Sequence, residues 1–351
     1  MKLVNIDELN EGQLLSKAVI SYDYQVLLAE GTILTNYYID KLKNMGITEV
    51  YIHDENYRNV EAVSVMKHET EELIHKNVRN ILEKHTYSRN KELQKLSVAA
   101  EEIVMNILNE EEVIDRIYDI RERSSDLYEH SVSACCLATL VSLRLNLDKE
   151  KVHDISVACL LHDIGLRYLN FEYVDRIVEE FNTVEAVEYY KHPIYGYTSL
   201  KEETWISELA KSIILHHHEY IDGSGFPMRK KDVPLEVRIV VTCDMFDEMI
   251  CGICQERRKV YEAIENLRVL RGFKLEDKIV DALLEFLAVY PVGSIVIINN
   301  GETGLVVRQN QSFSDRPVLK IIKDEDGNPL QEEKLIDMMK NKTIFIEQVV
   351  V

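Results

Sequence analysis

The feature that most constrains the fold is a long stretch of chain without glycine or proline. From Ile47 through Ile164 neither residue occurs, and the first proline of the whole chain is Pro193. Because glycine and proline are the residues that most often interrupt helices, such a stretch favours long helices. The sequence therefore predicts a mainly α-helical protein, with terminal segments of different composition that fold separately.

Both terminal segments alternate apolar and polar residues, which is typical of strands. Residues 1–57 predict a small hairpin with Gly31 in a turn, then a short helix that ends near Gly46 and a further strand. Residues 291–351 predict several strands joined by Gly-containing and Asp-Gly turns. We therefore expect a small N-terminal α/β module and a small β-rich C-terminal domain.

The remaining chain divides into two helical parts. Residues 58–112 are highly charged, with apolar residues at helical spacing, and predict one or two amphipathic helices. These helices form either a linker between domains or the seam of a homodimer. Residues 113–290 hold seven of the eleven histidines and are expected to carry the chemistry.

Composition excludes several classes of protein. Lysine and arginine total 41 against 61 aspartates and glutamates, a formal charge of −20, whereas nucleic acids and anionic membranes attract a basic surface. No signal peptide or membrane span is evident, so a cytoplasmic protein is expected. The six cysteines are expected to be buried, reduced thiols: Cys135, Cys136, Cys159, Cys243, Cys251 and Cys254.

Histidines and aspartates recur along residues 113–290 in a pattern that favours a metal site. His162 and Asp163 are adjacent after an apolar helix, and Asp126 precedes His130 by four residues, which places both on one face of a helix. A lone His-Asp pair is more often structural, but further candidates follow it: His192, His217, His218 and Asp244. Nitrogen and carboxylate ligands suit iron, manganese or zinc in hydrolysis. Asp163 is the candidate to bridge two cations.

These segments resemble the HD-GYP family, a branch of the bacterial HD-domain metal-dependent phosphohydrolases. The matching segments are HS at 130–131, HDIG at 162–165, HP at 192–193, HHE at 217–219, DGSGFP at 222–227 and DMFD at 244–247. The resemblance implies an HD-type helical bundle that hydrolyses cyclic di-GMP to pGpG or GMP through a metal-bridging hydroxide. It also implies two or three divalent cations, iron or manganese first, with zinc, magnesium or nickel as alternatives.

The resemblance assigns a role to each matching residue. His162 and Asp163 are the catalytic residues, and Asp126 with His130 is predicted to hold a third cation. The implied metal ligands are His130, His162, Asp163, His192, His217, His218 and Asp244, with Asp126 added. The implied substrate contacts are Asp222, Gly223, Gly225 and Phe226. Arg257, which follows the altered positions, is added as a basic residue that substitutes for the missing contact. Asp247 is expected to support the site, and His216 is expected to be a neighbour of the ligands.

The departures from the family pattern include Phe226, which replaces the tyrosine of the signature, and three positions where a basic residue is expected. Leu166 replaces the lysine that follows HDIG, Ile253 stands where an arginine is expected, and Glu256 stands where a basic residue is common. Loss of one charge-assisted phosphate contact costs about 1.5–3 kcal/mol. Two alternatives therefore stay open: a weakened member that acts as a nucleotide-binding or regulatory module, and a hydrolase of another cyclic dinucleotide or phosphorylated nucleotide.

Overall fold

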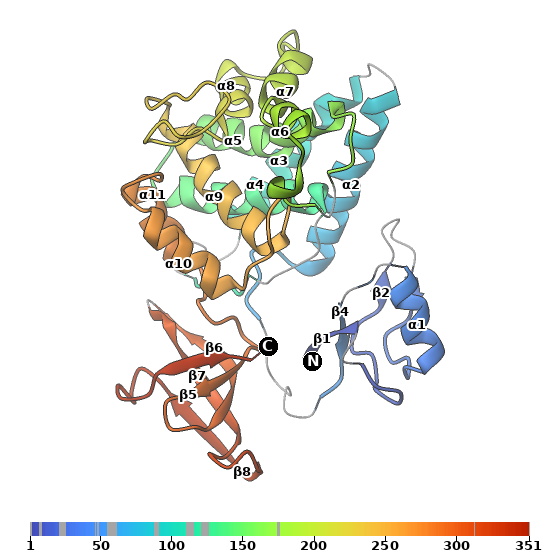
Figure 1. The fold of residues 1–351 in the computed structure, drawn as a ribbon, viewed down its shortest axis with the longest axis vertical. Coiled ribbons are helices and arrows are strands. Elements are labelled where there is room, and N and C mark those ends of the chain that lie inside the picture. The colour runs from blue at the N-terminus through green and yellow to red at the C-terminus, as the bar shows by residue number, and fades with distance from the viewer. Residues whose placement is uncertain are drawn as a thin grey trace. The chain divides into compact units, whose positions relative to one another are not determined.

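The protein is described here by a computed structural model, which divides into two compact units. One unit comprises Met1–Val63 with Tyr290–Val351, and the other comprises Ser64–Val289. Figure 1 shows the helices of the second unit and the strands of the first. The structure describes residues 2–6, 9–20, 26–45, 47, 49–54, 62–87, 91–109, 116–120, 126–173, 176–311 and 313–350.

The N-terminal segment has the predicted α/β composition. Helix α1 begins after Thr35, whose hydroxyl accepts a hydrogen bond from the backbone N–H of Tyr38. Gly31 lies in a turn with a φ of +77°, as its turn prediction requires. The elements are β1 (Lys2–Asn5), β2 (Val19–Ile20), β3 (Val26–Leu28), α1 (Asn36–Asn44) and β4 (Glu49–Ile52), with β1 paired to β4 and β2 paired to β3.

The C-terminal segment is an antiparallel sheet of five strands in the order β8-β7-β6-β5-β9. Gly327 has a φ of +81° in the turn between β7 and β8, where the Asp-Gly signal lies. Apolar residues that include Val296, Val306 and Leu319 form its core. The strands are β5 (Ile295–Ile298), β6 (Thr303–Asn310), β7 (Phe313–Lys323), β8 (Pro329–Asp337) and β9 (Ile346–Val349). The predicted small C-terminal β appendage is thereby confirmed, whereas its boundary at residue 291 stays a prediction.

The helical unit surrounds one central helix, α4. Residues on every side of α4 are buried, because α2, α3, α5, α9 and α11 pack around it. The α-helices are α2 (His68–Tyr87), α3 (Lys95–Leu108), α4 (Leu127–Arg144), α5 (Lys149–Leu161), α6 (Thr183–Tyr189), α7 (His192–Leu200), α8 (Glu208–His216), α9 (Leu235–Cys251), α10 (Val260–Leu270) and α11 (Asp277–Leu284). Among the described residues of the unit, 3-10 helices are η3 (Lys91–Gln94), η5 (His162–Tyr168) and η6 (Val178–Glu180). The predicted mainly helical fold is confirmed.

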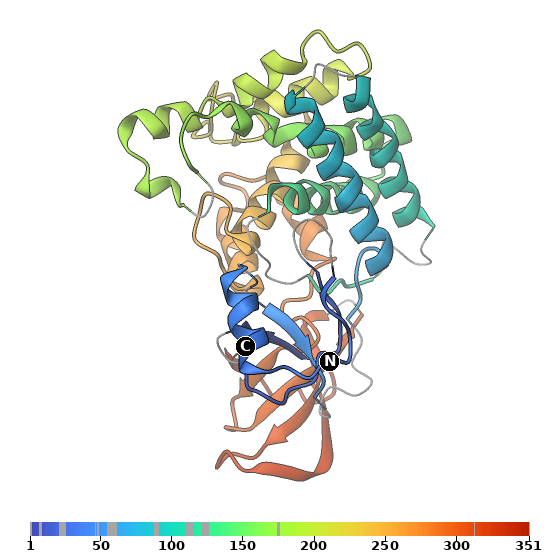
Figure 2. The same ribbon diagram turned by 90° about the vertical axis from the view of Figure 1, so that its right-hand side faces the viewer.

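Helices α2 and α3 belong to this unit, although the sequence suggested a linker or a dimer seam. They lie side by side in Figure 2. Both pack against α4, and α3 also packs against α5. The apolar face expected of α2 is buried there at Ile74, Val78 and Leu82, whereas Leu73 is exposed. These apolar residues therefore stabilise the helical unit itself. The predicted boundaries at residues 57 and 112 lie outside the described residues. The boundaries and the homodimer stay predictions.

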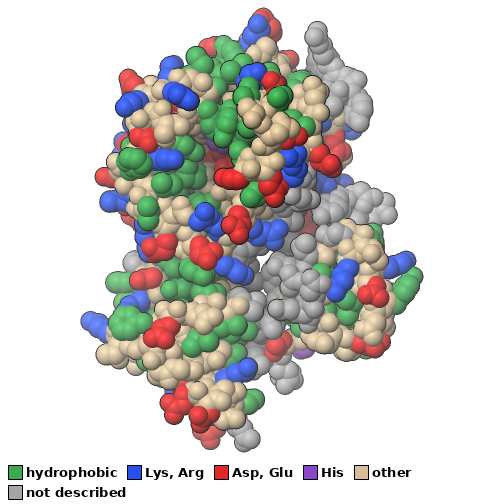
Figure 3. Space-filling view, viewed as in Figure 1, with side chains coloured by type: hydrophobic (Ala, Val, Ile, Leu, Met, Phe, Trp, Pro, Cys, Tyr) green, Lys and Arg blue, Asp and Glu red, His purple; other side chains and the backbone are tan. Residues whose placement is uncertain are grey.

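The surface shown in Figure 3 has acidic and basic side chains interspersed with apolar ones. Within the described parts of the chain, no helix combines the length and the apolar character needed to cross a membrane.

Candidate metal centre

The predicted ligands come from five parts of the helical unit and meet in its interior. They lie on α4, at the junction of α5 with η5, at the start of α7, after α8 and within α9. We call them the histidine–aspartate cluster, which comprises His130, His162, Asp163, His192, His217, His218 and Asp244. All seven side chains are at least 92 % buried. Such burial of charged and polar groups is costly unless they are paired with one another or with a cation.

A close approach of two backbones brings Asp163 beside His192. A Cβ on Gly165 would lie 1.9 Å from the carbonyl oxygen of His192 and 2.8 Å from the backbone nitrogen of Gly196. Only glycine fits at that position, which accounts for the glycine of the HDIG segment. The contact fixes η5 against the first turn of α7 and thereby holds the two motifs together.

One part of the cluster is a pair of imidazoles with a carboxylate. The Nε2 atoms of His130 and His162 lie 3.1 Å apart, and each lies 3.0 Å from Oδ1 of Asp244. The Nδ1 of His162 lies 2.7 Å from the carbonyl oxygen of Cys159. Because a carbonyl oxygen only accepts, Nδ1 of His162 carries a proton and Nε2 of the neutral ring presents its lone pair to the cluster.

A second pair of imidazoles shows most clearly that the cluster suits a cation. The Nε2 atoms of His192 and His217 lie 3.1 Å apart. Their Nδ1 atoms both donate to backbone carbonyls, at 2.8 Å from Tyr189 and 2.8 Å from Ile214. In the neutral rings two lone pairs therefore face each other without a proton between them. A bound cation removes this repulsion, so the donor set fits a metal ion.

Asp163 lies between the two imidazole pairs. Its Oδ1 is 3.4 Å from Nε2 of His192 and 3.6 Å from Nε2 of His217, while its Oδ2 is 3.4 Å from His162 and 3.7 Å from His130. Each carboxylate oxygen thus faces a different pair of nitrogens. This arrangement suits a carboxylate shared by two cations, which is the role that the sequence predicts for Asp163.

His218 and Glu248 extend the cluster. His218 belongs to the group with Asp163, His192 and His217, and its Nε2 is buried without a hydrogen-bond partner among the described residues. Glu248 forms a further candidate metal-binding group with His218 and Asp244. Glu248 is not among the ligands predicted from the sequence. The sequence feature that could have indicated Glu248 is its i, i+4 spacing from Asp244 on the same helix. This spacing places both carboxylates on one face of α9.

The buried groups of the cluster shift one another's pKa values. Burial opposes a proton on His130, yet hydrogen bonds to Asp244 and Asp247 raise the pKa of its imidazole well above the usual value. Burial alone would raise the pKa of Asp163, but the neighbouring histidines hold it well below its ordinary range. By contrast, burial and the charge of Asp244 raise the pKa of Glu248. Asp163 is therefore an ionised carboxylate that attracts cations.

Asp247 contacts the Nδ1 atom of His130, the ring nitrogen that faces away from Asp244, as expected of a residue that supports the site. Its Oδ2 lies 2.7 Å from Nδ1 of His130, and its Oδ1 accepts a hydrogen bond of 2.6 Å from the hydroxyl of Ser133. Both His130 and Asp247 are fully buried. A carboxylate in this position fixes the tautomer and the orientation of a ligating imidazole.

We expect Asp247→Asn to weaken metal binding about 10- to 100-fold, because an amide orients His130 less well than a carboxylate does. The side chain keeps its shape, so the protein should stay folded. Titration of metal-stripped protein with Mn²⁺ measures the effect, and Ser133→Ala is the milder control. Equal Mn²⁺ affinity in Asp247→Asn and the unchanged protein would show that Asp247 does not orient His130.

Asp126 does not reach the cluster. It is the N-cap of α4 with an extended backbone (φ −118°, ψ 116°), and its Oδ1 accepts hydrogen bonds from the N–H groups of Tyr128 and Glu129. Its Oδ2 pairs with Arg79 of α2. Both carboxylate oxygens of Asp126 are thus engaged by the start of α4 and by Arg79, which disfavours the predicted third cation at this position.

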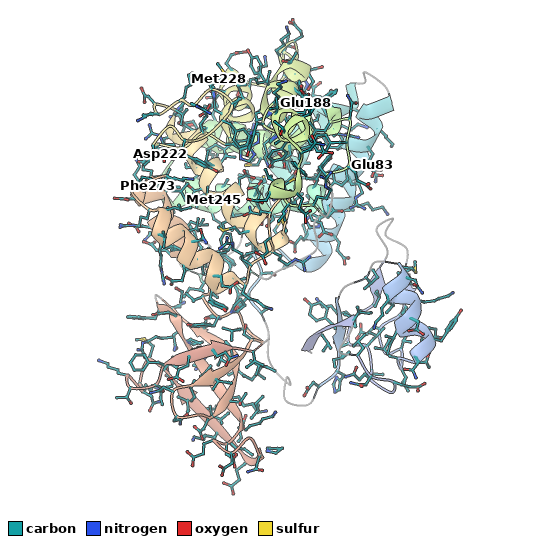
Figure 4. The ribbon with its side chains drawn as sticks, in the orientation of Figure 1. Glu83, Glu188, Asp222, Met228, Met245 and Phe273 are labelled. Carbon is teal, nitrogen blue, oxygen red and sulfur yellow. The ribbon has the colours of Figure 1, made fainter. Side chains whose placement is uncertain are left out.

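The predicted substrate contacts lie in two loops. Asp222 caps a turn through the N–H of Ser224 at 2.8 Å, and the adjacent Gly223 has a φ of +78°. Figure 4 labels Asp222 and Met228 in the loop after α8. Arg257 is exposed and packs against Gly252 at the end of α9; its described contacts do not bring it to the cluster.

Phe226 and Gly225 lie directly beside the cluster. The ring of Phe226 stacks on His218, with centroids 4.4 Å apart and planes 27° apart. A Cβ on Gly225 would lie 2.2 Å from the carbonyl oxygen of His218, so the loop passes close against the ligand residues. The carboxylate of Glu219 fixes this loop by accepting hydrogen bonds from the N–H groups of Met228 and Lys230, at 2.6 and 2.9 Å.

Two of the departing positions pack together. Leu166 and Ile253 are 1 % and 5 % exposed, and both belong to one apolar cluster. Its other buried members are Phe181, Tyr189, Cys251 and Cys254, and Phe226 packs against it. All six cysteines are buried and none forms a disulfide, as predicted. Arg167 does not replace the missing lysine, because its guanidinium donates to the carbonyl oxygen of Leu82 on α2.

Comparison with known proteins identifies the helical unit. A family model described as an HD domain matches residues 76–278, more than half of the chain. The chain belongs to the HD domain family. This HD domain is followed by residues that match a KOW domain associated with HD domains, at 295–351. The resemblance found in the sequence is thereby confirmed at the level of the HD domain.

Two relatives and one solved structure are similar to this chain. A cyclic di-GMP phosphodiesterase of Pseudomonas aeruginosa is 29 % identical over 58 % of this chain and 50 % of its own length. A 3'3'-cGAMP-specific phosphodiesterase of Vibrio cholerae is 30 % identical over 54 % of this chain and 35 % of its own length. The chain thus spans half or less of these relatives. The fold matches an HDG"Y"P protein from Bdellovibrio bacteriovorus with a TM-score of 0.54 and 19 % identity, covering 80 % of this chain and 97 % of that protein.

Proposed function

We propose that this protein is a metal-dependent phosphodiesterase that hydrolyses cyclic di-GMP to pGpG or GMP. The observation that carries the proposal is the position of Asp163, whose two oxygens face two separate imidazole pairs at 3.4–3.7 Å. The names of the relatives, which act on cyclic di-GMP and cGAMP, support a cyclic dinucleotide as substrate.

The side chains of the histidine–aspartate cluster would form two metal sites. One cation would be held by His130, His162 and Asp244, and the other by His192, His217 and His218. Asp163 would bind both cations. Iron or manganese suits this nitrogen and carboxylate donor set. When bound, two such cations supply a hydroxide nucleophile at neutral pH and neutralise charge that develops on phosphorus.

The cations would also offset the electrostatic repulsion between an acidic protein and an anionic substrate. The chain has a formal charge of −20, and the positions of two expected basic contacts are the buried, apolar Leu166 and Ile253. Bound divalent cations are the largest charges in such a site and reverse its local sign. Substrate affinity should therefore depend on the metal more than on basic side chains.

The test is an anaerobic assay of protein loaded with Fe²⁺ or Mn²⁺, with cyclic di-GMP, cGAMP and cyclic di-AMP as substrates and chromatography of the products. We expect pGpG or GMP from cyclic di-GMP. Protein treated with a chelator should lose both turnover and nucleotide affinity, and reloading should restore both. Absence of product from all three substrates, with two cations bound per chain, would contradict the proposed hydrolysis.

One observation favours a second candidate, a nucleotide-binding regulatory module with little turnover. The apolar packing of Leu166 and Ile253 removes two phosphate contacts while the cluster of metal-binding side chains is complete. In the same assay this candidate predicts tight binding of cyclic di-GMP to the loaded protein without product. The proposed enzyme instead predicts product from the bound nucleotide.

A further inference from the structure

A series of aromatic rings connects the histidine–aspartate cluster with the surface. Phe226 stacks on His218, and Tyr190 meets Phe226 edge-on with centroids 4.9 Å apart and planes 64° apart. Phe226 also lies 6.0 Å from the ring of His192. Tyr190 is the outermost ring of this series and is 43 % exposed. An accessible aromatic face therefore lies only two ring contacts from a predicted metal ligand.

The rings are held in place by the backbone beneath them. Tyr190 is the C-cap of α6, where its N–H bonds to the carbonyl oxygen of Ala186 at 3.0 Å. Phe226 is fixed by a hydrogen bond of 3.0 Å from its N–H to the carbonyl oxygen of His218. Figure 4 labels Glu188 on α6 and Met228 in the loop that carries Phe226. A planar ligand that stacks on these rings would lose little affinity to ordering of the protein.

Packing alone does not account for Tyr190. Its neighbour Tyr189 is 5 % exposed and belongs to the apolar cluster of Leu166, whereas nearly half of Tyr190 is accessible. Within the part of the chain that the structure describes, the hydroxyl of Tyr190 has no hydrogen-bond partner. The exposed face of the Tyr190 ring, which lies near the histidine–aspartate cluster, is thus available to a ligand.

We propose that Tyr190, with Phe226 behind it, is a stacking platform for a nucleobase of the substrate. The inference rests on the proposed function, because a nucleotide whose phosphate lies at the cluster carries its base one sugar away. Base–aromatic stacking does not require a matched hydrogen-bond pattern. Stacking on Tyr190 would contribute affinity for the nucleotide at a site where the apolar Leu166 and Ile253 provide no positive charge.

The experiment compares Tyr190→Ala, Tyr190→Phe and the unchanged full-length protein, all loaded with Mn²⁺. Calorimetry measures binding of GMP and of inorganic phosphate, and the assay gives KM for cyclic di-GMP. In Tyr190→Ala we expect GMP affinity to fall and KM to rise by about 5- to 100-fold, with phosphate affinity unchanged. Tyr190→Phe should retain GMP affinity. Tyr37→Ala, which removes a 62 % exposed tyrosine from α1, is the matched control.

The outcomes separate this inference from the proposed function. If the unchanged protein binds GMP and cleaves cyclic di-GMP while Tyr190→Ala matches it, the platform alone is wrong. Equal weakening of phosphate and GMP would also overturn it, because Tyr190 would then support the cluster and contact no base. If the unchanged protein neither binds GMP nor cleaves a cyclic dinucleotide, the platform and the proposed function are both wrong.

Discussion

Asp163→Asn is expected to lower phosphodiesterase turnover roughly 1,000-fold and to reduce the bound metal to at most one cation per chain. The reason is its position between the imidazole pairs, where each oxygen faces a different pair of nitrogens. An amide has only one acceptor oxygen and no charge, so it cannot serve two cations at once. Metal analysis of the purified variant and the cyclic di-GMP assay measure both effects.

The matched control for this variant is Asp232→Asn. Asp232 lies in the same unit, its side chain is fully exposed, and it pairs with Arg238 at 3.6 Å. Surface pairs of this kind contribute little to stability, so turnover and metal content should not change. Two cations per chain in Asp163→Asn, with turnover within tenfold of the unchanged protein, would show that Asp163 does not bridge them.

Leu166→Lys is expected to destabilise the protein by about 3–5 kcal/mol and not to restore a phosphate contact. Leu166 is 1 % exposed among Phe181, Tyr189 and Ile253, where a lysine would bury an unpaired charge. For a unit of this size the loss corresponds to a fall in Tm of roughly 10 °C. Thermal unfolding of the loaded protein measures it, together with turnover of cyclic di-GMP.

Leu166→Met controls for the change of shape at this position. Methionine conserves the volume and adds no charge, so its cost should stay below about 1.5 kcal/mol. A Leu166→Lys protein with an unchanged Tm and raised turnover would mean that the ammonium group reaches the substrate. The apolar cluster around Leu166 would then lower turnover and contribute little to the stability of the fold.

The sequence predicted the cluster because its segments point to the same chemistry jointly. His162, His192 and His217 each follow or begin a helix, and the carbonyl oxygens one turn earlier accept their Nδ1 protons. Helical spacing alone did not show that Asp126 caps the start of α4. The acidic Glu129 three residues later marks that start, which was the available signal for an N-cap.

Other features depend on contacts between segments distant in the chain. Leu166 and Ile253 each replace a basic residue, but the sequence cannot show that the two side chains pack in one apolar cluster. The stack of Tyr190, Phe226 and His218 likewise joins a helix end to a loop. For α2, an apolar stripe predicted burial correctly, whereas the partner that buries it lies on α4. Such pairings follow from tertiary packing, which helical periodicity does not encode.

The most direct test of the central claim is an anomalous difference map from crystals of the Mn²⁺-loaded protein. Two peaks are predicted, one on each side of Asp163, between His130 and His162 and between His192 and His217. No peak is predicted at Asp126, whose oxygens serve the N-cap and Arg79. A single peak, or two peaks that do not share Asp163, would contradict the account.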